Sequence, residues 1–126
     1  AIVIEHLAGA GRDLKLPYAP LRSALALSEL PNTTMKLPGL GEISERPARL
    51  LPHHRFEDVP PFVEMAVEAF GPKRLMWGSD FPPVANREGY RNALDGVRSH
   101  PALSGGEDAA EVMGRTAARV WGFDQR

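Results

Sequence analysis

The chain has 126 residues, which is enough for one small domain or for part of a larger one. Its 15 Lys and Arg residues nearly balance its 16 Asp and Glu residues, which excludes the strongly basic composition typical of nucleic-acid-binding proteins. It has no cysteine, so disulfide frameworks, thiolate metal sites and thiol nucleophiles are excluded as well.

The first half of the chain predicts two strands, each followed by a helix. Residues 1–4 form a continuous apolar run typical of a strand buried on both faces, and the strand is predicted over residues 2–6. Such a strand needs neighbours on either side, so we expect the chain to be the C-terminal part of a longer protein. A helix is predicted over residues 21–29 and a second strand over 33–37, followed by a connection over 38–57 that is too long for an ordinary loop.

The helix after this connection has the strongest pattern in the sequence. Apolar residues recur with helical spacing and define one face; they are Val59, Phe62, Val63, Ala66, Val67 and Phe70. Asp58 is the predicted N-cap, and Gly71-Pro72 is the predicted stop. The face predicts a helix packed against a core.

The last part of the chain predicts a third strand over residues 74–77 and helices over 87–99 and 107–121. Ser104 and Glu107 have the spacing of a capping box, and Gly114 is expected to divide the last helical region in two. The alternation of strands and helices predicts an α/β fold with a parallel sheet, in one partial domain over residues 1–126.

Two titratable residues follow predicted strands, where parallel α/β folds place their functional groups. His6 ends the first strand, and Asp80 follows the third. An aspartate in this place can bind a metal ion or accept a proton from water. The alternatives are a turn-forming role for Asp80 ahead of Pro82 and a packing role for His6.

Four further residues are candidates for substrate binding. Lys36 lies near the end of the second strand, and Glu42, Arg49 and His54 lie in the long connection. The alternative for each is a solvated side chain. The glycine pairs at 9 and 11 and at 39 and 41 lack the third glycine of a dinucleotide-binding loop.

The segment Arg74-Leu75-Met76-Trp77-Gly78-Ser79-Asp80-Phe81-Pro82-Pro83 resembles the final-strand signature of the amidohydrolase-2 family. Residues 2–9, 32–40 and 114–122 are similar to its sixth strand, its seventh strand and its closing helix. The resemblance implies the C-terminal part of a (β/α)8 TIM barrel, about strands six to eight. Glu5 departs from the family, because aspartate is usual in its place.

The resemblance also implies an activity, namely hydrolysis of a lactone or related carbonyl in a small-molecule substrate. Asp80 would activate water, and His6 would act as a metal ligand or as an electrophile. A divalent metal such as zinc, bound by His6 and Asp80, is the implied cofactor. A decarboxylase on the same scaffold is the alternative activity.

A reading from another class is a small non-catalytic α/β module whose open sheet edges bind a partner or form a homo-oligomer. No apolar run approaches the roughly 20 residues of a membrane span, so a membrane partner is not expected. The lack of cysteine suits a reducing compartment, and we expect a cytoplasmic protein.

Overall fold

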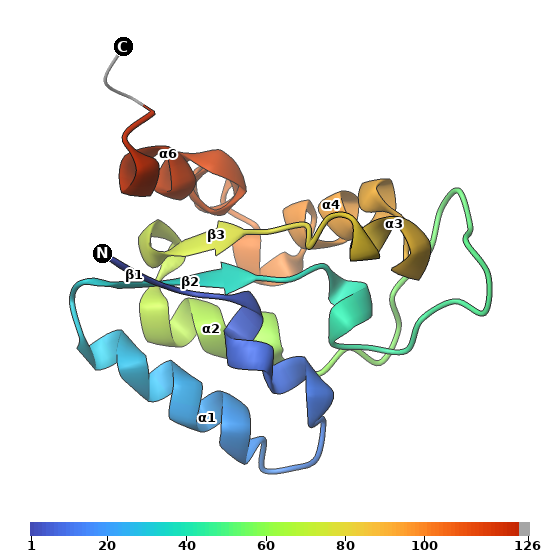
Figure 1. The fold of residues 1–126 in the computed structure, drawn as a ribbon, viewed down its shortest axis with the longest axis horizontal. Coiled ribbons are helices and arrows are strands. Elements are labelled where there is room, and N and C mark those ends of the chain that lie inside the picture. The colour runs from blue at the N-terminus through green and yellow to red at the C-terminus, as the bar shows by residue number, and fades with distance from the viewer. Residues whose placement is uncertain (124–126) are drawn as a thin grey trace.

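Three short parallel strands form the sheet at the centre of the computed structural model, which describes residues 1–123 (Figure 1). The strands lie in the order β1 (Ile2–Ile4), β2 (Thr33–Leu37) and β3 (Leu75–Trp77). Met35 of β2 is in register with Ile4 on one side and with Leu75 on the other. The predicted parallel sheet in an α/β fold is therefore confirmed.

Helices lie on both faces of the sheet (Figure 1). The α-helices are α1 (Ala19–Leu25), α2 (Phe62–Phe70), α3 (Pro83–Arg87), α4 (Tyr90–Arg98), α5 (Gly106–Ala110) and α6 (Thr116–Trp121). Short 3-10 turns occur at His6–Arg12, Ala26–Glu29, Leu40–Glu42, Pro72–Arg74 and Pro101–Leu103, and a π-helical turn at Glu111–Arg115 joins α5 to α6. Helices α1 and α2 cover one face, and α6 lies over the other (Figure 1).

The apolar face predicted for α2 points into the main core. Phe62, Val63, Ala66 and Phe70 are all buried. The ring of Tyr18 meets Phe62 edge-on, with the ring centroids 5.0 Å apart. Burial of about four such side chains, each contributing on the order of 1–3 kcal/mol, is what holds this helix against the sheet.

Two predicted helix caps are wrong. Asp58 lies in the connection with a φ of +51°, and α2 begins only at Phe62 with Pro61 as its N-cap. The two prolines explain the late start, because a residue that precedes proline is disfavoured in helical conformation. At α5, the N-cap is Gly105 and no side chain caps it, so the capping box of Ser104 and Glu107 does not form.

The helix predicted over residues 87–99 corresponds to α4, and the short helix α3 before it was not predicted. Helix α3 ends at Arg87, and α4 starts at Tyr90 after Gly89, whose φ of +86° is outside the helical region. The last helical region is divided into α5 and α6 as expected, and Gly114 lies in the π-helical turn that joins them. Helix α1 also starts two residues earlier than predicted.

The first strand is shorter and less buried than its apolar run predicted. Strand β1 ends at Ile4, so His6 begins the following turn and is not part of the strand. Ile2 is 52% exposed, because within residues 1–123 only β2 pairs with β1.

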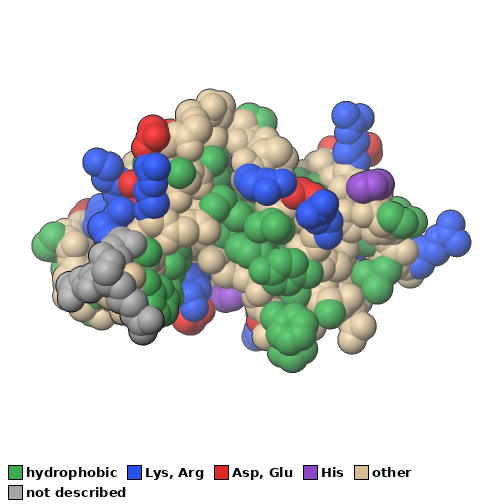
Figure 2. All heavy atoms as spheres, turned by 90° about the horizontal axis from the view of Figure 1, so that it is seen from above, with side chains coloured by type: hydrophobic (Ala, Val, Ile, Leu, Met, Phe, Trp, Pro, Cys, Tyr) green, Lys and Arg blue, Asp and Glu red, His purple; other side chains and the backbone are tan. Residues whose placement is uncertain are grey.

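On the face of the molecule that carries α6, α4 and α3, apolar side chains gather into a band between charged groups (Figure 2). No helix among residues 1–123 is long and apolar enough to span a membrane.

Candidate active site

The carboxyl ends of the three strands bring His6, Lys36 and Asp80 to one edge of the sheet. His6 and Asp80 adopt the left-handed backbone conformation, with φ values of +43° and +56°. This conformation is uncommon for residues other than glycine, and it clusters at functional sites because the surrounding structure must hold it. Here it turns the chain sharply just beyond β1 and β3.

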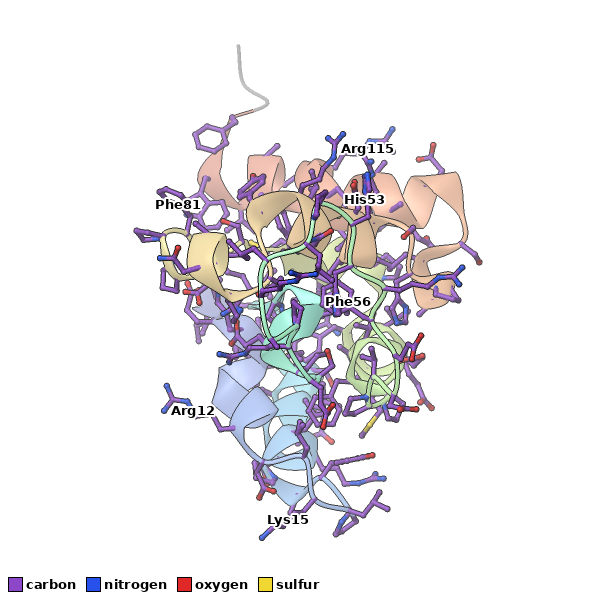
Figure 3. All side chains as sticks on the ribbon, turned by 90° about the vertical axis from the view of Figure 1, so that its right-hand side faces the viewer. Arg12, Lys15, His53, Phe56, Phe81 and Arg115 are labelled. Carbon is purple, nitrogen blue, oxygen red and sulfur yellow. The ribbon has the colours of Figure 1, made fainter. Side chains whose placement is uncertain are left out.

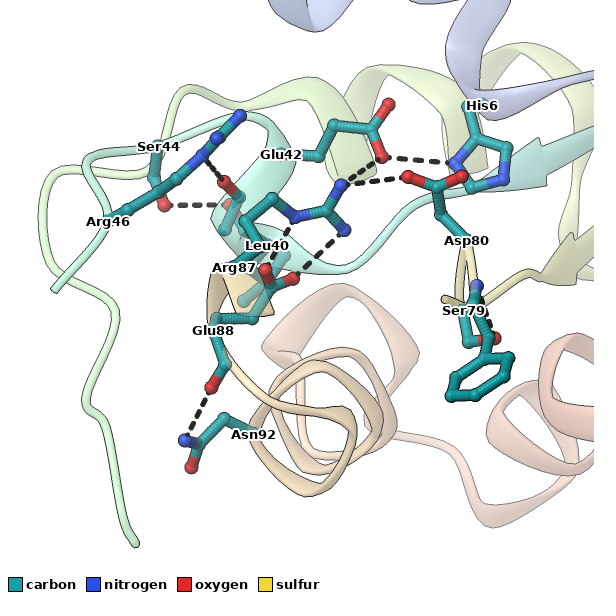
Figure 4. Close-up of polar contacts among 12 residues, drawn as sticks. His6, Leu40, Glu42, Ser44, Arg46, Ser79, Asp80, Arg87, Glu88 and Asn92 are labelled. Carbon is teal, nitrogen blue, oxygen red and sulfur yellow. Dashed lines mark hydrogen bonds and ion pairs between the residues drawn. The ribbon is translucent and has the colours of Figure 1, made fainter. Parts of the chain in front are cut away.

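A chain of polar contacts links His6 to Asp80 (Figure 4). The Nδ1 atom of His6 lies 3.1 Å from Oε2 of Glu42, which belongs to the turn after β2. The same carboxylate oxygen accepts a hydrogen bond of 3.3 Å from Nη1 of Arg87. That nitrogen also donates to Oδ2 of Asp80 at 3.0 Å. Glu42 and Arg87 thus bridge the two candidate catalytic residues.

Arg87 is itself held by the next residue in the chain. Its Nε and Nη2 atoms donate to the two carboxylate oxygens of Glu88, at 2.5 and 3.2 Å. The side chain of Arg87 is 7% exposed and that of Glu88 is fully buried. A buried carboxylate is stable only when it is paired and hydrogen-bonded, and the two-point pair with Arg87 meets that need.

The electrostatics of the site favour a positively charged His6. The hydrogen bond to Glu42 raises the pKa of the His6 imidazole above its ordinary value of 6.5, and this outweighs partial burial, which lowers it. The negative charges of Glu42, Asp80 and Glu5 raise the pKa further. Because the folded-state pKa is raised, the stability contributed by this pair is complete below pH 6.5 and is lost as the pH rises through the folded-state value.

Lys36 lies on the same face of the sheet, beside His6. Lys36 is in register with Met76. Gly78 lies close to both Lys36 and His6, since a Cβ atom on Gly78 would lie 3.2 Å from Lys36 Cδ and 3.5 Å from His6 Nε2. The ammonium group of Lys36 pairs with Glu5 at 2.8 Å and lies 5.5 Å from the ring centroid of Trp121. The acidic residue before His6 therefore holds a lysine at the site.

The other two substrate-binding candidates lie apart from this cluster. Arg49 is exposed in the long connection. The backbone N–H of His54 donates to Asn92 at 3.0 Å, and its ring packs edge-on against Phe56. His54 lines an open pocket that does not include His6 or Asp80. Figure 3 shows the side of the molecule where this connection runs, with Phe56 on it and Phe81 projecting from the turn after Asp80.

Glu42, predicted to bind substrate, contacts His6 and Arg87, and its role in substrate binding stays a prediction. Arg87 and Glu88 were not predicted as site residues at all. In the sequence Arg87 is only the first residue of an expected helix, and an Arg-Glu dipeptide is ordinary on a solvated surface. The burial of Glu88, which singles the pair out, is visible only in the structure.

A zinc or similar ion would need more ligands than this part of the chain provides. Protein zinc sites use at least three side-chain ligands. Residues 1–123 contain no cluster of three or more His, Asp or Glu side chains placed to hold an ion. One nitrogen of His6 and one oxygen of Asp80 are already engaged by Glu42 and Arg87. The metal assignment of His6 and Asp80 stays a prediction.

Comparison with known proteins identifies the class. The amidohydrolase family profile matches residues 1–123, so the chain belongs to the amidohydrolase family. The predicted family is thereby confirmed. No match to a functionally curated protein is found.

Solved structures agree with this assignment. An amidohydrolase from Burkholderia multivorans with bound zinc is 26% identical, with a TM-score of 0.74 over 95% of this chain and 43% of that protein. A second crystal form with bound HEPES gives 29% identity, a TM-score of 0.73 and coverage of 95% and 44%. A Pseudomonas putida protein proposed to be a 2-pyrone-4,6-dicarboxylic acid hydrolase shares the fold, with 20% identity, a TM-score of 0.64 and coverage of 98% and 43%.

The chain thus spans less than half the length of these relatives and corresponds to part of an amidohydrolase barrel. Its assignment to strands six to eight stays a prediction.

Proposed function

We propose that this chain carries part of the active site of a hydrolase that opens a lactone or a related carbonyl compound. In this reaction water adds to the carbonyl carbon, Asp80 accepts a proton from the water, and the C–O bond of the ring breaks. The proton passes to the leaving oxygen, which gives a hydroxy acid. The observation that carries the proposal is the placement of His6 and Asp80 at one sheet edge, joined through Glu42 and Arg87.

The environment of Asp80 suits a general base. Arg87 holds one carboxylate oxygen at 3.0 Å, which orients the group. The side chain of Asp80 is nevertheless 38% exposed, so water can reach the carboxylate. A base that is oriented and accessible is what proton abstraction from water requires.

The environment of His6 suits an electrophile. Glu42 engages Nδ1, which leaves Nε2 as the ring nitrogen directed toward Gly78. An N–H group in this place can donate to the oxyanion that forms as water adds to the carbonyl. Lys36 adds a positive charge on the same face.

The family and the proposed activity of the Pseudomonas putida relative support a small carbonyl substrate, including carboxylated lactones. A panel of sugar lactones together with 2-pyrone-4,6-dicarboxylate is therefore the probe set for activity. Acid release is measured with a pH indicator and CO2 release is measured in parallel. Release of CO2 in place of a ring-opened acid would favour a decarboxylase.

The first prediction concerns Asp80→Asn in the full-length protein. Loss of the base should lower kcat by about 10²–10⁴-fold while the fold is retained. Asp13→Asn, on an exposed connection, is the matched control and should keep full activity. A turnover of Asp80→Asn within a factor of about three of the unaltered protein would remove Asp80 from the mechanism.

A further inference from the structure

We propose that Arg87 is a positioning residue for this site, and that buried Glu88 together with the loop Gly39-Leu40-Gly41 forms the socket that orients it. The inference rests on the proposed function of Asp80 and extends it to the residues that hold the Asp80 carboxylate in place. It also assigns a structural role to Gly39 and Gly41, which do not form a dinucleotide-binding loop.

Burial of the ion pair between Arg87 and Glu88 fixes the orientation of Arg87. Glu88 is fully buried, and both of its carboxylate oxygens accept hydrogen bonds from Arg87. A planar guanidinium that is held at two points has a fixed orientation, which a single contact would not give. The direction of the remaining nitrogen, Nη1, is therefore set by Glu88.

The Nη1 atom of Arg87 contacts two carboxylates of the site. It donates to Asp80 at 3.0 Å and to Glu42 at 3.3 Å. Arg87 thus sits between the proposed base and the residue that engages His6. Without its charge, three carboxylates would face one another around an empty position, and their repulsion would move Asp80.

The loop Gly39-Leu40-Gly41 approaches the Glu88 side chain closely. A Cβ atom on Gly39 would lie 2.6 Å from Oε1 of Glu88, and one on Gly41 would lie 2.6 Å from Cδ of the same side chain. The φ of Gly39 is −65°, which any residue can adopt. A Cβ atom on Gly39 would also lie 2.7 Å from Cβ of Ala93. Space for Glu88 and Ala93, and not backbone freedom, therefore requires glycine at position 39.

The alternative is an ion pair that serves stability alone. The two roles predict different kinetics, because a displaced base lowers kcat while binding of the ground-state substrate is retained. The near-complete burial of Arg87 also keeps it from contacting substrate, since its donors are engaged by Glu42, Asp80 and Glu88.

The test uses the full-length protein and the lactone of the panel that it hydrolyses fastest. Arg87→Lys keeps the positive charge but removes the two-point hydrogen bonding of the guanidinium group. Glu88→Gln keeps the shape of the side chain but removes its negative charge. Gly41→Ala places a methyl group in the space that the Glu88 carboxylate occupies. Each should lower kcat by about 10²-fold, as expected for a misplaced catalytic group, with KM within a factor of about three. Gly114→Ala is the matched control, because a Cβ atom there meets nothing within 4 Å.

A second measurement separates positioning from stability. Arg87→Ala leaves a cavity that guanidinium ion can enter, and added guanidinium should raise kcat by at least about tenfold without a matching change in melting temperature. Crystal structures of Glu88→Gln and Gly41→Ala should show that the Asp80 carboxylate has moved away from the Arg87 side chain.

The outcomes distinguish this inference from the proposed function. If Asp80→Asn is inactive while the folded variants at 87, 88 and 41 keep normal kcat, the positioning role is overturned and the function of Asp80 stands. If Asp80→Asn is active, the proposed function itself fails. Unfolding of all the variants at 87, 88 and 41, or folded Arg87→Ala without guanidinium rescue, would assign Arg87 to stability and overturn its positioning role.

Discussion

At the scale of single residues, His100 shows how burial and one hydrogen bond select a protonation state. Its Nδ1 atom accepts a hydrogen bond of 3.2 Å from the backbone N–H of Ala102 and caps the turn that follows. Burial lowers the pKa of His100 below 6.5, and the negative charge of Glu64, at 3.9 Å from Nε2, opposes this only in part. The neutral ring is therefore the form that the fold requires.

This arrangement predicts that acid destabilises the protein through His100. The unfolded chain takes up a proton near pH 6.5 and the folded chain does so only at a lower pH, so stability falls as the pH drops below 6.5. His100→Asn keeps a capping side chain and should flatten this part of the curve of unfolding free energy against pH, measured by urea denaturation.

The control for this prediction is His53→Asn, at an exposed position in the long connection. It should leave the slope unchanged. His6 titrates in the opposite sense, because its pKa is raised, so only the difference between variants isolates the effect of His100. An unchanged slope in His100→Asn would contradict the prediction.

At the scale of elements, we expect two glycines to affect the stability of the fold in opposite directions. Gly71 ends α2 with a φ of +69° and a ψ of 154°, a region that is nearly exclusive to glycine. Gly114 lies within the π-helical turn between α5 and α6. A Cβ atom at either position would meet nothing within 4 Å, so backbone conformation alone decides the outcome.

We therefore expect Gly71→Ala to lower the free energy of unfolding by about 1–3 kcal/mol, the cost of forcing alanine into this region. Gly114→Ala should raise it by about 0.5–1 kcal/mol, because alanine loses less backbone entropy in a helix. Urea denaturation of the two variants measures both effects. Changes of the same sign at the two positions would show that local conformation is not the cause.

At the scale of the whole molecule, the sheet has two outer strands, each paired on one side only within residues 1–123. Ile2 on β1 is 52% exposed, and apolar side chains form a band on the face seen in Figure 2. The related amidohydrolases are more than twice as long as this chain. Unpaired strand edges and apolar surface together favour association with further strands.

We predict that residues 1–126, expressed alone, self-associate as the protein concentration rises. Sedimentation velocity would measure this, and Ile2→Lys should weaken it by placing a charge on the strand edge. Leu16→Lys is the control, since Leu16 is exposed on a connection away from the sheet and its change should have no effect. A monodisperse monomer at every concentration would contradict the prediction.

Local patterns in the sequence were sufficient to predict the alternation of strands and helices, the buried face of α2 and the placement of His6 and Asp80 near the carboxyl ends of two strands. Each of these depends on residues close together in the chain, whose periodicity follows from backbone geometry. The predicted helix caps at Asp58 and Ser104 were wrong: Pro61 is the N-cap of α2, and Gly105 is the N-cap of α5. The preference for a capping residue is weak enough for its surroundings to outweigh it.

The connections within the site were decided by the tertiary structure alone. The contact between Glu42 and His6 spans 36 positions in the chain, and the contact between Glu42 and Arg87 spans 45. The seating of Glu88 against Gly39 and Gly41 likewise depends on a turn after β2 meeting the start of α4. A sequence shows which residues are charged. Which charges are buried and paired depends on the packing that excludes water from them, and that packing exists only in the fold.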